Sequence, residues 1–219
     1  MAATKSSHSK KNYYSINNGH FTQPANENEG VQRKIEKKDG STKIVWEHQF
    51  DEVSGIIKSV EIQDTDWGDQ YQITISDIGE EFILQINCDS KYGNDFAAKF
   101  PNIKLNNQIT FKPYSFTPED KKRKMEGFVI TQNGMKILQY YTKENPNGLP
   151  SLEKYQDAGV MSNPPSTADW KMFFAKRSEF MMNKVKDIIK NAPQQEPPQK
   201  QEVTPKQEDN DFDALPFWC

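Results

Sequence analysis

The feature that most constrains the fold of this sequence is a series of short segments in which apolar and polar residues alternate. Tyr71, Ile73 and Ile75 alternate with polar residues, and after the turn DIGE the same period continues over 82–86. Successive side chains of a strand point to opposite faces, so this period predicts half-buried β-strands. Similar segments run over 43–50, 56–62, 107–116, 126–132 and, after the hairpin signal Asn133-Gly134, 135–141.

One helical segment interrupts these strands. The stretch DSKYGNDFAAKF, residues 89–100, is predicted to form a short helix. The helix is expected to end before Pro101, because the residue before a proline disfavours the helical region. The resulting order is three strands, a short helix and two more strands. This order predicts a mainly β domain over 13–150, built as an OB-like Greek-key barrel with extra N- and C-terminal strands.

A long amphipathic helix is predicted over 166–191. Ser166 or Thr167 can cap it, and Asp169 favours the positive end of the helix dipole. Its broad apolar stripe needs a cover, either the barrel of the same chain or a second subunit, so both a monomer and a homodimer remain open. The segment 151–165 before it is rich in Pro, Gly, Asn and Ser and is interpreted as a linker.

The two ends of the chain differ in charge. Residues 1–12 are rich in Ser and Lys, and we expect them to be disordered. Residues 192–219 combine many Pro, Gln and Glu with no apolar period, which predicts a second disordered segment. From Pro193 onward there are six acids and two lysines, whereas the net charge of the whole chain is -3. The remainder is therefore nearly neutral, and the tail is acidic.

Several functional classes find no support in the sequence. There is no Walker loop, no GxSxG and no HExxH, and the three histidines form no ligand set with Cys88 and Cys219. We therefore predict no enzyme, no metal site and no cofactor. No run approaches the roughly 20 apolar residues of a membrane span, and no apolar segment follows the basic N-terminus. These features predict a cytoplasmic protein with no membrane partner.

Aromatic residues interleaved with cations point instead to nucleic acid. In FKPYSF, a strand would place Lys112, Tyr114 and Phe116 on one face. Such a ladder can hold a phosphate and stack bases on its rings, as in grooves that bind single-stranded nucleic acid. The alternative is that Tyr114 and Phe116 belong to the core.

Further cations lie near this ladder in the predicted barrel. The loop before 126 contains the consecutive basic residues Lys121, Lys122, Arg123 and Lys124. Weaker candidates for nucleic-acid binding are Lys37, Lys43, Trp67, Lys91 and Tyr92. Trp46 could stack on a base, but packing under the C-terminal helix is the favoured expectation. Each of these cations could also be an ordinary solvated surface residue.

Several stretches together resemble a known family. The segments YYSINNGHF, TKIVWEHQFDEVSGII, FILQINCDSKYGNDFAAKFPNI, ITFKPYSF and NPNGLP, followed by a Pro/Gln-rich linker and an acidic, aromatic-ended tail, are similar to the phage-encoded single-stranded DNA-binding proteins. The resemblance implies an OB-fold that coats single-stranded DNA without sequence specificity during replication, recombination or repair of bacteriophage DNA. It also implies that the tail recruits replication or recombination proteins and competes with DNA.

The tail matches this pattern in part. The acids Asp209, Asp211 and Asp213 precede an apolar motif of Leu215, Pro216, Phe217 and Trp218. Bacterial tails of this kind end on the Phe itself, whereas here Trp218 and Cys219 follow it. Two other classes remain open: a protein-interaction scaffold that uses the tail as a short linear motif, and an RNA-binding regulator.

Overall fold

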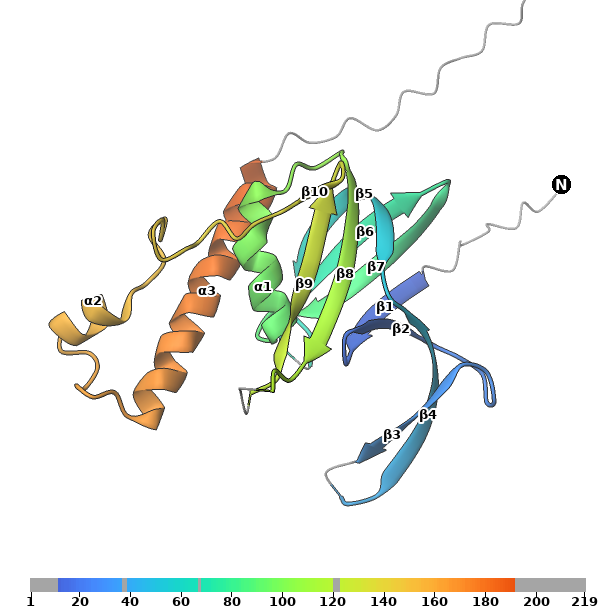
Figure 1. Ribbon diagram of the computed structural model, residues 1–219, viewed down its shortest axis with the longest axis horizontal. Helices are drawn as coiled ribbons and strands as arrows, with labels where there is room; N and C mark the ends of the chain where they lie inside the picture. The colour runs from blue at the N-terminus through green and yellow to red at the C-terminus, as the bar shows by residue number, and fades with distance from the viewer. Residues whose placement is uncertain (1–11, 37–38, 67, 120–122, 192–219) are drawn as a thin grey trace, which may run out of the picture.

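The computed structural model describes residues 12–36, 39–66, 68–119 and 123–191, and these residues form one ten-stranded mixed sheet flanked by helices (Figure 1). The strands are β1 (Asn12–Asn17), β2 (His20–Pro24), β3 (Val31–Glu36), β4 (Thr42–Phe50), β5 (Val53–Gln63), β6 (Gln70–Asp77), β7 (Glu80–Asn87), β8 (Gln108–Phe116), β9 (Met125–Gln132) and β10 (Met135–Lys136). The helices are α1 (Lys91–Lys99), the 3-10 turn η1 (Phe100–Asn102), α2 (Leu152–Asp157) and α3 (Thr167–Asn191). The prediction of a mainly β fold with a C-terminal helix is confirmed.

The sheet is open rather than closed into a barrel. Its strand order is β10-β9-β8-β5-β6-β7-β1-β2-β4-β3. The pairs are antiparallel except for β1 with β7, which run parallel from Asn12 beside Phe82 to Tyr14 beside Leu84. A closed five-stranded barrel would need a β7–β9 pair, and the described residues contain none. The predicted closure is therefore not confirmed.

The alternating period of β6 and β7 produces the core. Tyr71, Ile73 and Ile75 are buried, as predicted, because every second residue of β6 faces inward. Strand β5 departs from its predicted phase: its register with β6 shifts between Ile57 and Ser59. A bulge adds one residue and moves the next side chain to the opposite face.

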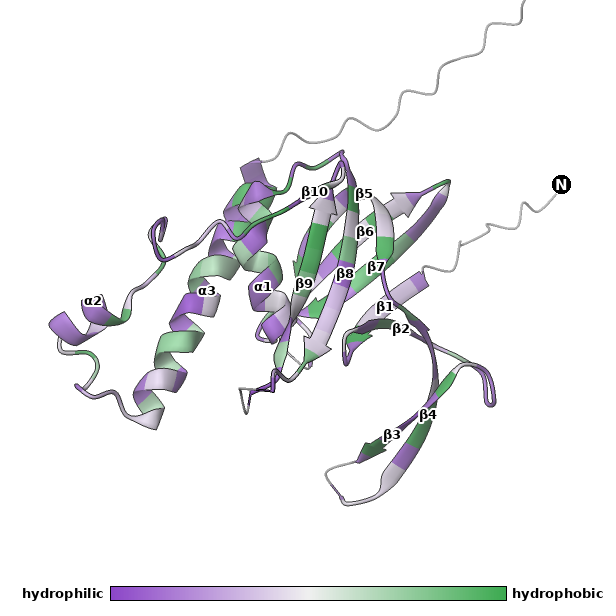
Figure 2. Cartoon of the chain, viewed as in Figure 1, coloured by the Kyte–Doolittle hydropathy of each residue, from purple (hydrophilic) through white to green (hydrophobic). Residues whose placement is uncertain are grey.

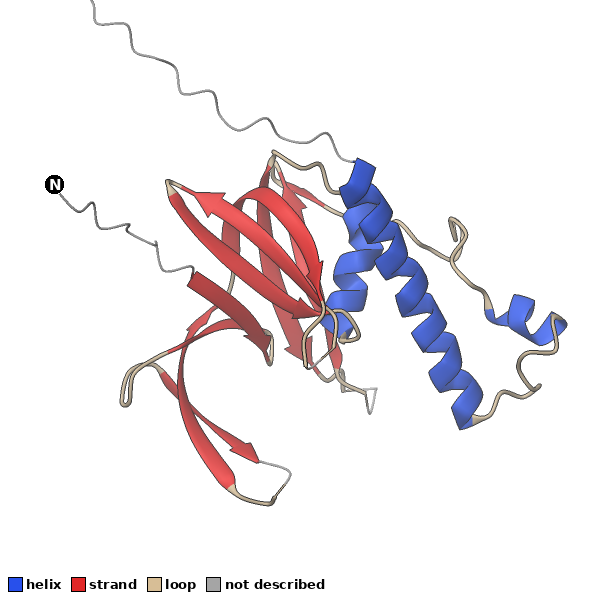
Figure 3. Ribbon diagram, turned by 180° about the vertical axis from the view of Figure 1, so that it is seen from behind, coloured by secondary structure: helices blue, strands red, loops and turns tan. Residues whose placement is uncertain are grey.

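Helices α1 and α3 lie side by side next to the sheet (Figure 3). Phe96 of α1 is fully buried against the rings of Tyr71 and Phe111. The C-terminal half of α3 packs on the same core through Met181 and Val185, so the chain itself covers this half of the apolar stripe. The N-terminal half of the helix is left more open.

Several sequence-based boundaries were wrong. Asn12, assigned to the disordered N-terminus, begins β1, and the predicted linker 151–165 contains α2, capped by Ser151. The strand predicted over 135–141 ends at Lys136. Beyond it, the amide of Tyr140 donates to the carbonyl of Ala98 on α1 at 2.7 Å, because the chain leaves the sheet to cross the helix.

The predicted position of Trp46 was also wrong. This residue lies in the β3–β4 ribbon, which projects from the body on the side away from α3 (Figure 1). Trp46 does not belong to the core cluster or to the partly buried apolar residues packed against it in the described chain. It therefore does not pack under the C-terminal helix.

Candidate nucleic-acid interface

The predicted ladder on β8 exists as a shared face. Lys112, Tyr114 and Phe116 alternate with residues of the opposite face, and Lys112 is exposed. Phe116 is 53% exposed and Tyr114 is half-buried, so neither ring is a core residue. The two ring centroids lie 5.9 Å apart, with 45° between the planes. A pair of accessible rings on the same face as a cation suits base stacking and phosphate contact.

A glycine on the neighbouring strand makes room for Tyr114. Gly127 on β9 is the cross-strand partner of Tyr114, and a Cβ at Gly127 would lie 2.6 Å from the tyrosine hydroxyl oxygen. Burial, and secondarily the negative charge of Asp95, raise the pKa of the Tyr114 phenol. Tyr114 is therefore neutral at physiological pH and presents no charge that would repel a phosphate.

Tyr92 is not available for stacking, contrary to the sequence-based prediction. It is buried in the first turn of α1, a helix that Ser90 caps by accepting from the Gly93 amide at 2.9 Å. The Tyr92 hydroxyl donates to the carbonyl of Tyr114 at 3.1 Å, and its ring lies edge-on to Phe128. Tyr92 thus positions the ladder from beneath.

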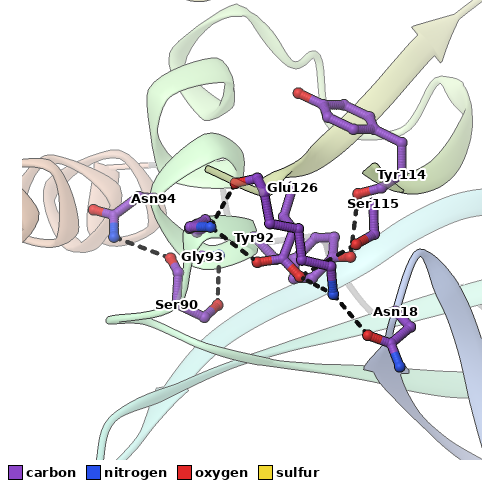
Figure 4. Close-up of polar contacts among 10 residues, drawn as sticks. Asn18, Ser90, Tyr92, Gly93, Asn94, Tyr114, Ser115 and Glu126 are labelled. Carbon is purple, nitrogen blue, oxygen red and sulfur yellow. Dashed lines mark hydrogen bonds and ion pairs between the residues drawn. The ribbon is translucent and has the colours of Figure 1, made fainter. Parts of the chain in front are cut away.

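Two of the predicted cations meet at one carboxylate. Lys91 of α1 and Lys124 of the β8–β9 connection both pair with Glu126, at 3.3 Å and 3.1 Å. Lys124 Nζ also donates to Asn18 Oδ1 at 2.7 Å, which ties this corner to the β1–β2 turn (Figure 4). Burial alone would raise the pKa of Glu126, but hydrogen bonds from Lys124 and Lys91 outweigh it and lower the pKa. One positive charge of this trio therefore remains uncompensated.

A groove of ≈ 860 Å³ adjoins this corner and lies between α1, the start of β9 and α3. Its lining combines four cations and one acid with apolar side chains and one amide: Lys91, Arg123, Lys124, Arg177, Glu126, Met125, Phe174, Met181 and Asn94. Met125 is the cross-strand partner of Phe116, so the groove continues from the ladder. It provides an apolar floor for a ring and a cationic rim for anions.

Sequence reasoning placed Phe174 and Arg177 only on the stripe of a helix and missed them as site residues. Phe174 is 59% exposed and stacks on Trp170, with ring centroids 5.7 Å apart. Arg177 lies over the ring of Phe173, at 5.4 Å from its centroid, and burial lowers its pKa. The sequence signal that could have revealed them was Arg177 within the apolar stripe. A charged residue there indicates that this part of the helix is not fully buried.

The remaining predicted residues are spread more widely. Lys43 lies on β4 in the projecting ribbon, away from the ladder. The predicted residues Lys37, Trp67, Lys121, Lys122, Asp209, Asp211, Asp213, Leu215, Pro216, Phe217 and Trp218 lie outside the described residues. Of the predicted set, the structure places Lys112, Tyr114 and Phe116 on one face of β8 and places Lys91, Arg123 and Lys124 around the adjoining groove.

The described residues contain no group of three or more His, Cys, Asp or Glu that could hold a metal ion. Cys88 is a buried free thiol. Between 12 and 191, outside the three short gaps, no helix has the length and apolarity needed to cross a membrane.

Comparisons with protein-family models, curated proteins and solved structures gave no match for this chain.

Proposed function

We propose that this protein binds single-stranded DNA without sequence specificity and protects it during replication, recombination or repair. The observation that carries the proposal is the ring pair of the half-buried Tyr114 and the exposed Phe116, which shares one face of β8 with Lys112. Every base has a π-face, so stacking on such rings tolerates any sequence. Phosphate contacts from the neighbouring cations supply affinity without base readout.

The strand order supports the same proposal. The succession β5-β6-β7-α1-β8-β9, with spatial order β9-β8-β5-β6-β7, supports an OB-like arrangement in which the third and fifth strands are unpaired. In OB folds the connections between strands 1 and 2 and between strands 4 and 5 border the bound oligonucleotide. Here these connections contain Trp67 and the basic run 121–124.

The acidic tail completes the proposal. Asp209, Asp211 and Asp213 can mimic phosphates, and the apolar motif 215–218 can anchor in a pocket of a replication or recombination protein. Because DNA binding rests on cations, a tail that occupies them weakens it. Removal of residues 207–219 is expected to tighten DNA binding at low salt, and unchanged affinity would contradict tail competition.

The central test is fluorescence anisotropy of a labelled oligo-dT with full-length protein. The double substitution Tyr114→Ala and Phe116→Ala is expected to weaken binding by roughly 1–3 kcal/mol per lost stacked base. Met135→Ala is the matched control, because Met135 is 71% exposed and lies beyond the opposite end of β9. Binding that is absent in wild type, or equal in the ladder variant and the control, would refute the proposal.

The same titrations separate the other two classes. A protein-interaction scaffold would neither bind the oligonucleotide nor show a salt-dependent affinity. An RNA-binding regulator would prefer oligo-rU to oligo-dT in direct competition, since the 2′-hydroxyl is what distinguishes RNA from DNA at a binding site.

A further inference from the structure

The β3–β4 ribbon extends beyond the rest of the sheet. Strand β2 pairs with β4 as far as Pro24 opposite Glu47, and the Ala25 amide then donates to the Trp46 carbonyl at 2.8 Å. Among the described residues, β3 alone pairs with the rest of β4. We call residues 31–36 together with 42–47 the arm. Figure 1 shows the arm on the far side of the body from α3.

The arm has no described element to cover it. Hydrophobic residues occur on both of its strands (Figure 2), and Val31 and Ile44 are 48% and 50% exposed. A two-stranded ribbon is at best marginally stable in water, because it lacks a second layer that would bury its apolar side chains. By register Val31 and Ile44 lie on opposite faces of the ribbon, so each face leaves one apolar side chain about half exposed.

One face of the arm combines a large ring with a cation. Gln32 is the cross-strand partner of Trp46, and Lys34 is the partner of Ile44. These four side chains therefore share a face, with Lys34 diagonal to Trp46 and within reach of it. Trp46 is half-buried, and in the described chain its ring makes none of the ring–ring or cation–ring contacts seen elsewhere.

The opposite face fixes the arm in register. Arg33 donates from Nε and from its terminal nitrogen to the two carboxylate oxygens of Glu47. Glu47 is 8% exposed, and Arg33 compensates the charge of this buried carboxylate. Lys34 and Lys43 are exposed and without an ion pair among the described residues, whereas Glu36 is the one exposed acid of the arm. By register Lys34 and Glu36 lie on the Trp46 face, whereas Lys43 lies on the opposite face with Arg33. Its three cations and two acids give the arm as a whole a net charge of +1.

We infer that the arm is a second nucleic-acid contact, with Trp46 stacking on a base and Lys34 contacting a neighbouring phosphate. This inference rests on the proposed function and extends the bound strand from the β8 ladder to the arm. The net positive charge of the arm, and a Lys34 without an ion pair beside Trp46, favour a polyanion over a neutral protein surface. A second copy is a poorer occupant, because symmetric antiparallel pairing centred on β3 would bring Arg33 and Lys34 of both copies together.

The test uses full-length protein and two oligo-dT probes, one of roughly 8 nucleotides and one several times longer. Trp46→Ala is expected to lower affinity for the long probe at least five-fold, and to leave the short probe, which the ladder can hold alone, nearly unchanged. Trp46→Phe keeps a stacking ring and is expected to retain most of the affinity. Wild-type tryptophan emission should fall on binding the long probe, and Trp46→Phe should remove part of that quench.

Lys34→Glu provides a second variant that leaves the ring intact. It is expected to weaken binding of the long probe several-fold and to reduce the salt dependence of that binding. Gln32→Glu adds an acid on the same face and is the control for a general change in charge. If Lys34 contacts a phosphate, Gln32→Glu should weaken binding less than Lys34→Glu. If wild type binds neither probe, the proposed function itself fails. If wild type binds and both arm variants match it on the long probe, the inference fails and the function stands. A loss of dimer mass in Trp46→Ala would assign the arm to a second copy and overturn the inference.

Discussion

Lys99 of α1 donates a hydrogen bond from Nζ to the main-chain carbonyl oxygen of Phe128 on β9, at 2.6 Å. The same ammonium pairs with Asp95 one turn earlier, also at 2.6 Å, and Asp95 accepts from the Phe128 amide at 2.7 Å. Asp95 and Lys99 of one helix therefore bind the main-chain amide and carbonyl of Phe128, which point away from β8. In a closed barrel another strand would pair with this edge of β9. Here α1 instead supplies hydrogen-bond partners to the main chain of Phe128, and the sheet stays open.

Replacement of Lys99 by Met tests this link. The side chain of Lys99 is 8% exposed and that of Asp95 is 10% exposed, so the substitution leaves a buried carboxylate and a buried carbonyl short of a partner. We expect a loss of about 3 kcal/mol in the free energy of unfolding, measured by urea denaturation. Lys176→Met is the matched control, because its i,i+3 pair with Glu179 is half exposed and screened by solvent, so its loss should change the stability much less. Equal losses in the two variants would contradict the assignment.

Glu126 is predicted to restrain nucleic-acid binding. It compensates one of the two lysines at the mouth of the groove, so Glu126→Gln frees a cation for phosphate. We expect oligo-dT affinity at low salt to rise a few-fold and its salt dependence to steepen. Glu81→Gln, an exposed carboxylate on β7, controls for the change in net charge. An equal gain from both substitutions would show that only the overall charge matters.

The local parts of the fold could be predicted from the sequence. The period of β6 identified Tyr71, Ile73 and Ile75 as buried, because it depends on residues close in the chain. For the same reason the sequence limited the cap of α3 to Ser166 or Thr167, and the structure has Ser166 accept from the Asp169 amide. The parallel pairing of β1 with β7 depends on contacts about 70 residues apart, and no local pattern specifies it.

The candidate site divides in the same way. Lys112, Tyr114 and Phe116 share a face because of strand geometry alone, so the sequence was sufficient. The groove is assembled from Lys91, Met125 and Phe174 on three elements, and only the packing of α3 against α1 brings them together. Burial also removed Tyr92 from the site, and an aromatic residue beside a lysine gives no sign of which way its ring will face.

Cys88 is predicted to be unreactive in the folded protein. It is 3% exposed, and burial raises the pKa of its thiol to about 12, so the thiolate is scarce at neutral pH. In a Cys219→Ser variant, a thiol reagent such as DTNB should react slowly without denaturant and stoichiometrically in urea. Fast reaction of the folded variant would show that the core around Cys88 opens readily.

Asp169 is predicted to make α3 sensitive to acid. Its carboxylate accepts hydrogen bonds from Ser162 Oγ at 2.6 Å and from the Ser166 amide and hydroxyl, each at 2.8 Å, and these lower its pKa to about 2. Because the folded-state pKa lies below the ordinary value of 3.8, the stabilisation is complete above that value and is lost as the pH falls toward 2.

Carboxyl carbon chemical shifts measured by NMR over this range would give the pKa directly. Ser162→Ala should raise the pKa of Asp169 toward its ordinary value, since it removes the hydrogen bond that lowers this pKa most. Asp169→Asn keeps the size of the side chain but cannot titrate, so its thermal midpoint should change less than that of wild type between pH 4 and pH 2. Parallel losses in the two proteins would show that Asp169 does not couple α3 to pH, and that the Ser166–Asp169 capping box holds equally well when protonated.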